Sequence, residues 1–171
     1  MSTEKVITDI RTGVRALTIL KEELERRVPI LRSDDKEFHK LPFIVCIIDE
    51  FQVFTDSLLN ETDAESTSKI ISFLVEQGRK YKIHMVLASN DFTKKRIECN
   101  LSPITARVAF KVDKWSTSQV IIGCTGAESL SGQGAMLFRS IEYSEPINIQ
   151  GAYILKVHIN DRTENWKVIK N

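Results

Sequence analysis

The fold is decided by the stretch Leu41-Pro42-Phe43-Ile44-Val45-Cys46-Ile47-Ile48-Asp49-Glu50, in which six consecutive apolar residues run directly into two carboxylates. Six residues suit a buried strand, whereas a buried helix normally needs about ten or more. Because apolar and polar residues do not alternate, we predict a strand in a sheet covered on both faces. Ligands of open parallel sheets collect outside the carboxyl ends of the strands, so Asp49 and Glu50 are expected at a functional edge.

An apolar strand that ends in Asp-Glu is typical of the Walker B segment of nucleoside triphosphatases. In that pattern the Asp, here Asp49, holds a magnesium ion through water, and the Glu, here Glu50, polarises the water that attacks the γ-phosphate. Taken alone, these two residues fit a merely acidic, solvated strand end equally well, since paired carboxylates also occur in structural roles.

The composition indicates a soluble globular protein. A length of 171 residues suits one ordinary domain, and the shares of apolar (42%) and charged (27%) residues are those of a folded chain. The net charge of +1 gives no overall attraction to nucleic acid or membrane, so any basic surface must be local. We expect a cytoplasmic chain, because no apolar run is long enough to span a membrane and the first residues do not lead into a signal peptide.

The three cysteines, Cys46, Cys99 and Cys124, are odd in number and lack a C-x-x-C spacing. This pattern favours a reduced compartment and no zinc site. Cys46 lies inside the apolar run and is predicted to be a small core residue.

Two amphipathic helices are predicted from apolar residues that recur three and four positions apart. The first, residues 9–27, ends before Pro29 and leaves Arg27 solvated at its end. The second, residues 65–80, contains Gly78, which either allows close approach to a neighbour or ends the periodic segment.

A second short buried strand is predicted at Met85-Val86-Leu87-Ala88. A strand, a helix and a strand with a crossover of this length form a parallel pair with a right-handed connection. Asn90 is therefore expected at the same edge of the sheet as Asp49. Further strands are predicted at residues 106–110, 135–138 and 147–154.

Three adjacent cations, Lys94, Lys95 and Arg96, lie in the polar segment that follows Asn90. At the ligand edge of a sheet they can meet phosphate groups. A solvated loop tip is the other interpretation, and it is the commoner one for a run of like charges.

The order of these pieces resembles the motor domain of the FtsK/SpoIIIE DNA translocases, which are RecA-like ATPases. The resemblance covers about Val6 to Ile154 and leaves 155–171 as a C-terminal tail. It implies an α/β RecA-like P-loop NTPase core with a mostly parallel sheet, as one partial domain over residues 1–171. The matching motifs are the E-R-R helix, L-P-x-I-V-x-x-I-D-E, a helix ending G-R, I-H-M-V-L-A, T-A-R-V-A-F, G-A-E-S-L-S-G-Q-G-x-M-L-F and Q-G-A-Y.

The Walker A loop of the family, G-x-x-x-x-G-K-[ST], is absent from this sequence. The backbone nest and the lysine that cradle the phosphates are therefore missing, and the chain is similar to the second half of a motor. We expect the isolated chain to be inactive for this reason.

The resemblance implies roles for three residues at the predicted edge. Asp49 matches the acid that holds Mg²⁺, and Glu50 matches the acid that activates water. Asn90 stands where the family has a sensor Gln in A-T-Q-R-P, so it is expected to hydrogen-bond a phosphate with a reach shorter by one methylene. Other departures from the family, at Asp91, Gln119 and Ala135, suggest a diverged or impaired motor.

The resemblance also implies contacts outside the nucleotide. Arg79 and Arg107 match family arginines, and the resemblance implies that either one can lie near a neighbouring subunit's nucleotide, although a surface arginine paired with a carboxylate is an equal alternative. The segment with Lys94, Lys95 and Arg96 lies toward the pore of the ring, where duplex DNA passes. His84 also matches, but a histidine at the start of a strand is more often structural.

These observations predict part of an ATP- and Mg²⁺-dependent translocase of double-stranded DNA that works as a ring, a hexamer in the complete protein, in DNA segregation or conjugative transfer. Family members are often anchored in the inner membrane. The alternatives are a ring or scaffold subunit that has lost turnover, and the ATPase of a protein secretion system with the same motor fold. A Ser/His/Asp hydrolase is remote, because Ser89 and His84 are present without a nucleophile elbow.

Overall fold

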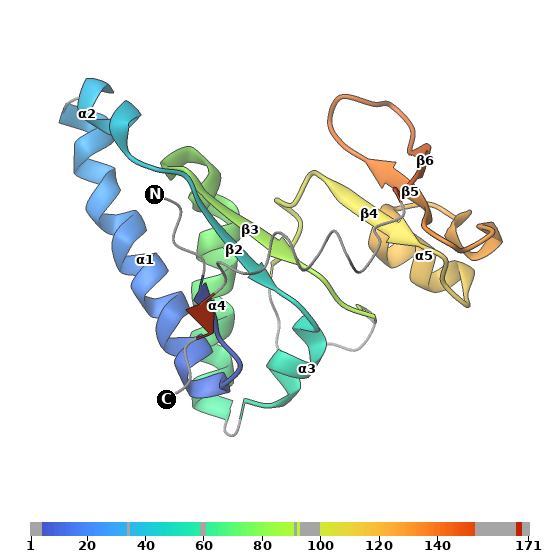
Figure 1. Ribbon diagram of the computed structural model, residues 1–171, viewed down its shortest axis with the longest axis horizontal. Helices are drawn as coiled ribbons and strands as arrows, with labels where there is room; N and C mark the ends of the chain where they lie inside the picture. Colours follow the sequence, from blue (N-terminus) through green and yellow to red (C-terminus); the bar gives the residue numbers. More distant parts are fainter. Residues whose placement is uncertain are drawn as a thin grey trace. The chain divides into compact units, whose positions relative to one another are not determined.

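The computed structural model of the protein describes residues 5–33, 35–58, 61–90, 92, 100–152 and 167–168. The chain forms two compact units, one comprising Asp9–Ile104 and the other comprising Met1–Thr8 together with Thr105–Asn171. Figure 1 shows the helices and strands of each unit. The single domain over residues 1–171 stays a prediction.

The unit Asp9–Ile104 is built on two parallel strands. Strands β2 and β3 pair in register, with Ile44 opposite Ile83 and Ile48 opposite Leu87, as the crossover pattern predicts. Helices α1 and α4 lie on one side of this pair (Figure 1). The elements are α1 (Ile10–Ser33), α2 (Asp35–Lys40), β2 (Ile44–Ile48), α3 (Phe51–Asp56), α4 (Glu61–Gln77), the 3-10 helix η1 (Gly78–Tyr81) and β3 (Ile83–Leu87).

The core of this unit lies between the helices and one face of the strands. Leu24 of α1, Ile71 and Leu74 of α4 and Ile83 of β3 are each at most 1% exposed. Gly78 is required here, because a Cβ at this position would lie 2.6 Å from the carbonyl oxygen of Ile83. The prediction that Gly78 allows close approach to a neighbour is therefore confirmed.

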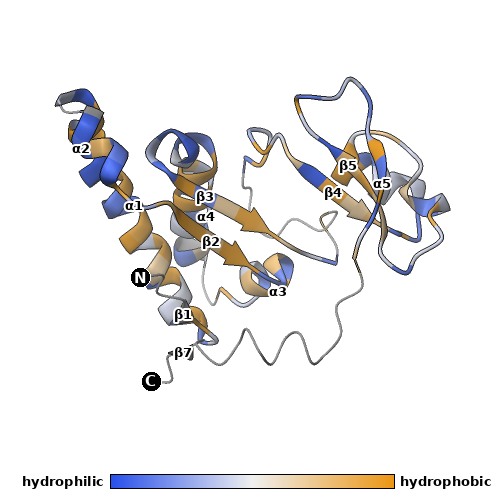
Figure 2. Cartoon of the chain, turned by 45° about the horizontal axis from the view of Figure 1, so that its top comes forward, coloured by the Kyte–Doolittle hydropathy of each residue, from blue (hydrophilic) through white to orange (hydrophobic). Residues whose placement is uncertain are grey.

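The other face of β2 and β3 is apolar and exposed. Val45 is 58% exposed and Ile47 is 68% exposed, and Val86 on β3 is 45% exposed. Figure 2 shows that both strands are mostly hydrophobic. The prediction of a sheet covered on both faces is wrong for the part of the chain that the structure describes, because α1 and α4 supply cover on one side only.

Arg27 is the main correction inside this unit. It is 1% exposed, although the sequence predicts a solvated side chain. Its guanidinium donates to the carboxylate of Glu23 (2.7 Å) and to the backbone carbonyls of Pro42 and Tyr81 (2.9 Å each). Each carbonyl lies just before a strand, so Arg27 ties α1 to the start of both β2 and β3.

Helix α1 also runs further than predicted. It continues to Ser33 with Pro29 inside it, although a proline costs a helix interior about 3 kcal/mol. The residues around the proline, Val28, Ile30 and Leu31, pack against the core and offset this cost. The apolar contacts therefore extend the helix past the residue at which its local sequence predicts an end.

Glu23 makes the stability of this unit depend on pH. The pKa of Glu23 is lowered from 4.5 to about 2, chiefly by the hydrogen bonds from Arg26 and then by the hydrogen bond from Arg27, while burial acts in the opposite direction. Because the pKa is lower in the folded state, this stabilisation is fully present above about pH 4.5 and is lost as the pH falls toward 2.

We predict that Glu23→Gln makes the free energy of unfolding less dependent on pH between 6 and 3. The wild-type chain should lose about 1–2 kcal/mol more than the variant over this range, a value reduced for the partial exposure of Glu23. Guanidinium unfolding at each pH measures the difference. Glu25→Gln on the same helix is the matched control, and an equal loss in wild type and Glu23→Gln would contradict the assignment.

The second unit is organised by an antiparallel sheet in the order β4-β5-β6. Ala109 of β4 lies opposite Leu137 of β5, and both pack on one face with Ile122 and Ala127 in a small core. The sequence predicts these strands but not their antiparallel direction. The elements are β1 (Lys5–Val6), β4 (Arg107–Phe110), α5 (Trp115–Ile122), the 3-10 helix η2 (Ala127–Ser129), β5 (Ala135–Arg139), β6 (Ile147–Gln150) and β7 (Lys167–Val168), with β1 and β7 forming a parallel pair.

Candidate functional site

Polar side chains meet where β2 and β3 end. The N–H of Ala88 donates to the carbonyl of Ile48 (2.9 Å), and the N–H of Phe51 donates to the carbonyl of Ala88 (2.8 Å). These bonds continue the pairing past the strands. The Nδ2 of Asn90 then lies 2.9 Å from Oε1 of Glu50 and donates a hydrogen bond to it. The structure thus brings Glu50 and Asn90 together from two strands.

Glu50 has an unusual backbone conformation. Its φ and ψ are both 48°, in the left-handed region, which costs a residue with a side chain about 1 kcal/mol or more. The carbonyl of Glu50 accepts a hydrogen bond from Phe54 (3.0 Å), and this begins α3. The turn therefore ends the strand sharply and leaves the Glu50 side chain exposed beside β3.

Asp49 is held in the same turn. Its Oδ1 accepts the N–H of Glu50 (3.0 Å), which orients the carboxylate of a residue that is otherwise exposed to solvent. A hard oxygen ligand of this kind fits Mg²⁺, which binds through one or two carboxylates, substrate phosphates and retained water. Among the described residues no group of three or more His, Cys, Asp or Glu side chains gathers into a metal cluster.

Arg79 lies at the opposite end of the strand pair. It is exposed on η1, which immediately precedes β3, whereas Glu50 and Asn90 follow the strands. A strand of five residues spans about 16 Å, so Arg79 does not meet the acids of its own chain. This position fits a contact with another molecule, and that role stays a prediction.

Arg107 is engaged within its own unit. It stands opposite Arg139 across β4 and β5. Arg107 donates to the carbonyl of Ile121 (3.4 Å) and Arg139 to that of Ile122 (2.7 Å), so both cations lie at the C-terminal end of α5, where positive charge is favourable. Gly123, at φ 83°, provides the space for Arg139. Arg139 is not among the residues that the sequence singles out, because only the strand register reveals it.

Two further departures from the family pattern, Gln119 and Ala135, lie in the second unit. Gln119 is exposed on α5, and its Nε2 donates to the carbonyl of Gly123 (3.2 Å). Ala135 begins β5, and its N–H donates to the carbonyl of Gly132 (3.0 Å). Asp91, Cys99 and the cations Lys94, Lys95 and Arg96 lie outside the described residues.

The two remaining candidates from the sequence, His84 and Cys46, lie in surroundings that indicate structural roles. The ring of His84 lies against that of Phe43, with centroids 5.7 Å apart on the exposed face of the sheet. Burial raises the pKa of the Cys46 thiol, which favours the unreactive neutral form. Neither residue lies at the edge that carries Glu50 and Asn90.

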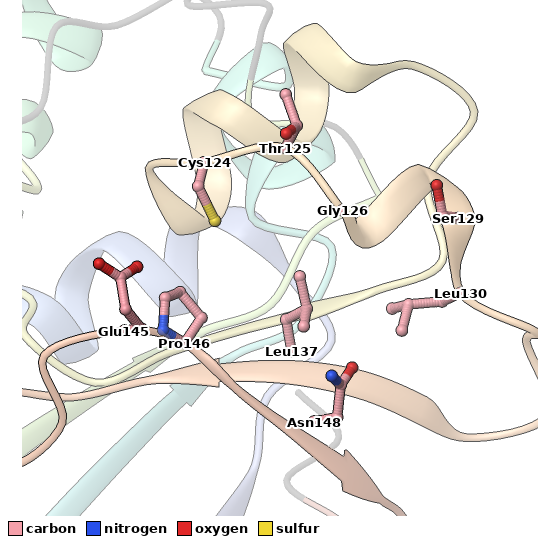
Figure 3. Close-up of a pocket in the computed structure, with 9 residues that line it drawn as sticks. All are labelled: Cys124, Thr125, Gly126, Ser129, Leu130, Leu137, Glu145, Pro146 and Asn148. Carbon is pink, nitrogen blue, oxygen red and sulfur yellow. The ribbon is translucent and has the colours of Figure 1, made fainter.

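A surface pocket of 520 Å³ lies in the second unit. Figure 3 shows it between the Cys124–Gly126 loop and the strands β5 and β6. Its lining contains the carboxylate of Glu145 and the amide of Asn148 but no lysine or arginine, so it offers no charge that would hold a phosphate.

Comparison with known proteins identifies the family of this chain. The chain is 36% identical to the DNA translocase FtsK of Chlamydia trachomatis over 97% of its length, 34% identical to that of Treponema pallidum over 87% and 33% identical to that of Lactococcus lactis over 84%. This chain belongs to the FtsK family. It spans about one fifth of these FtsK proteins, 22%, 20% and 18% of their respective lengths. No family model matches the chain.

Solved structures confirm the RecA-like α/β fold. The conjugation coupling protein TcpA of pCW3, in a monomer form with ATPγS, superimposes with a TM-score of 0.73 over 85% of this chain and 45% of TcpA, at 20% identity. The cytoplasmic domain of the type VII secretion ATPase EccC from Thermomonospora curvata gives 0.64 over 87% of this chain and 19% of EccC, at 15% identity. Within the described part of this FtsK-family chain, no helix has the length and apolar character needed to cross a membrane.

Proposed function

We propose that this chain forms the metal and water side of the nucleotide site in an FtsK-type motor that moves duplex DNA. The observation that carries the proposal is the meeting of Glu50 and Asn90, next to Asp49, at the ends of two parallel strands. Open parallel sheets bind their ligands at this edge. The identity to FtsK translocases supports DNA as the cargo.

The three residues divide the work of hydrolysis among them. Bound Mg²⁺–ATP would supply the phosphoanhydride bond and an electrophilic γ-phosphorus. The carboxylate of Asp49 would hold the metal through water. Glu50 accepts a proton from the attacking water as general base. Asn90 lies beside Glu50 and provides an amide at the same edge.

The phosphates themselves must be held by residues outside this chain, because its sequence contains no G-x-x-x-x-G-K-[ST] loop. The exposed apolar face with Val45, Ile47 and Val86 supports this division, because a complete motor sheet buries its strands on both sides. The FtsK relatives are about five times as long as this chain, so the phosphate-binding residues of a complete motor can lie in a part that this chain does not match. We propose that the complete motor works as a hexameric ring with the nucleotide at subunit boundaries.

One experiment tests DNA translocation against two alternative functions. A scaffold subunit that has lost turnover is suggested by Asn90 in place of the family's Gln and by Ala135 in place of its Asp. A motor for protein secretion has the same fold, but the likeness to EccC is limited to that fold. Measuring ATP hydrolysis with and without duplex DNA distinguishes all three functions.

We predict that Glu50→Gln in the complete motor carrying these residues lowers duplex-stimulated ATP hydrolysis by about 100-fold or more. The amide keeps the shape of the side chain but cannot accept the proton, so ATP binding should stay within about twofold of wild type. Steady-state hydrolysis and equilibrium ATP binding measure the two effects.

Glu142→Gln is the matched control, since Glu142 is an exposed glutamate in the other unit. It should leave both hydrolysis and binding unchanged. Normal turnover by Glu50→Gln would show that Glu50 is not the base. A parent protein that binds ATP without hydrolysing it would instead favour the scaffold function.

The second prediction of this function concerns Lys94, Lys95 and Arg96. We expect these cations to contact DNA phosphates without regard to sequence, and each lost contact lowers the dependence of log affinity on log salt by about one unit. Replacing all three by Ala in the complete oligomer should therefore reduce the slope by about three. Duplex affinity at several salt concentrations measures it.

A variant with three exposed lysines replaced, Lys36, Lys40 and Lys69, is the control with the same loss of charge. It should keep the wild-type slope. An unchanged affinity and slope in the first variant would mean that the loop is a solvated tip and that the motor grips its cargo elsewhere.

A further inference from the structure

The hydrogen bond between Asn90 and Glu50 is a contact that the family pattern does not predict. The family residue at this position is expected to contact phosphate, yet here the amide nitrogen lies 2.9 Å from a carboxylate oxygen of Glu50. Both side chains are exposed, and an exposed hydrogen bond adds little to stability. Its consequence is the orientation of the Glu50 carboxylate.

The backbone of Glu50 and the hydrogen bond from Asn90 together set the direction of this carboxylate. The backbone of Glu50 is in a left-handed turn, with φ at 48°. Two hydrogen bonds hold this turn: the N–H of Phe51 donates to the carbonyl of Ala88, and the N–H of Glu50 donates to the carboxylate of Asp49. Asn90 has only two side-chain torsions and follows a strand that is paired in register with β2. The backbone therefore fixes one end of the Glu50 side chain and the Asn90 amide fixes the other.

We infer that Asn90 is a positioning residue that aims the Glu50 carboxylate at the attacking water, rather than a ligand of the γ-phosphate. Oε1 accepts the amide hydrogen and Oε2 stays available to accept the proton of water. A general base has to lie within hydrogen-bond reach and in line with that proton, and a base is commonly oriented by a third group. This inference rests on the proposed ATP hydrolysis.

The shorter side chain of asparagine explains the change of partner. Asn90 has one methylene fewer than the glutamine of the family, so its amide stays close to the strand end, where Glu50 lies. Because its nitrogen is directed to Glu50, the Asn90 side chain is assigned the role of orienting this general base. The amide cannot itself accept a proton at neutral pH, so Asn90 acts only through Glu50.

The first test separates positioning from phosphate binding. In the complete motor, Asn90→Ala and the isosteric Asn90→Asp should each lower kcat for ATP hydrolysis by about 10- to 100-fold, with the KM for ATP within about twofold of wild type. Asn90→Gln keeps the amide and should recover most of the rate. A rise in KM with an unchanged kcat would assign Asn90 to the phosphate and overturn the inference.

The second test asks whether Asn90 acts through Glu50. In a Glu50→Gln background, Asn90→Ala should cause no further loss of the residual hydrolysis, because the group that it orients is already removed. A further loss of about 10-fold would mean that Asn90 acts independently, and the inference would fail. If the parent motor hydrolyses no ATP, the proposed function itself fails. Measuring the parent motor alone distinguishes this outcome from a failure of the inference about Asn90.

The contact itself can be measured on this chain without nucleotide. The side-chain NH₂ signals of Asn90 in ¹⁵N–¹H spectra, assigned by their loss in Asn90→Ala, should shift in Glu50→Gln and stay in place in Glu142→Gln. Asn90 signals that are equal in wild type and Glu50→Gln would show that the two side chains do not interact, and would overturn the inference.

Discussion

The parallel register of β2 and β3 is the constraint on which the site depends. The N–H of Ile44 donates to the carbonyl of Lys82 where the strands begin, and the N–H of Ala88 donates to the carbonyl of Ile48 where they end. Arg27 fixes the starting end by binding a carbonyl in front of each strand. A shift of one residue would turn the strand faces over and separate Glu50 from Asn90.

The two ends of this strand pair have different physical characters. At the starting end, Arg27 is buried, and its guanidinium is bonded to Glu23 and to two carbonyls. At the other end, Glu50 and Asn90 are exposed and Glu50 is held in an unfavourable left-handed conformation. One end is therefore buried and hydrogen-bonded, and at the other the pairing maintains a strained turn that exposes a carboxylate.

The sequence predicts the parts of this arrangement that depend on local patterns. The apolar run before Asp49, the crossover and the close approach at Gly78 follow from spacing and residue size. The burial of Arg27 does not, because an arginine four residues after Glu23 resembles a surface pair and its carbonyl partners are distant in sequence. The contact between Asn90 and Glu50 depends on side-chain torsions, and the exposed face of β2 depends on which elements cover it, so neither is readable from spacing.

The most direct test of the divided nucleotide site is a calorimetric titration of Mg²⁺–ATP into this chain. In the proposed site Asp49 and Glu50 supply the metal and water side, and the sequence contains no G-x-x-x-x-G-K-[ST] loop to hold the phosphates. We predict no saturable binding in the micromolar range. Saturable micromolar binding would contradict the division of the site, because the phosphates would then be held by residues of this chain.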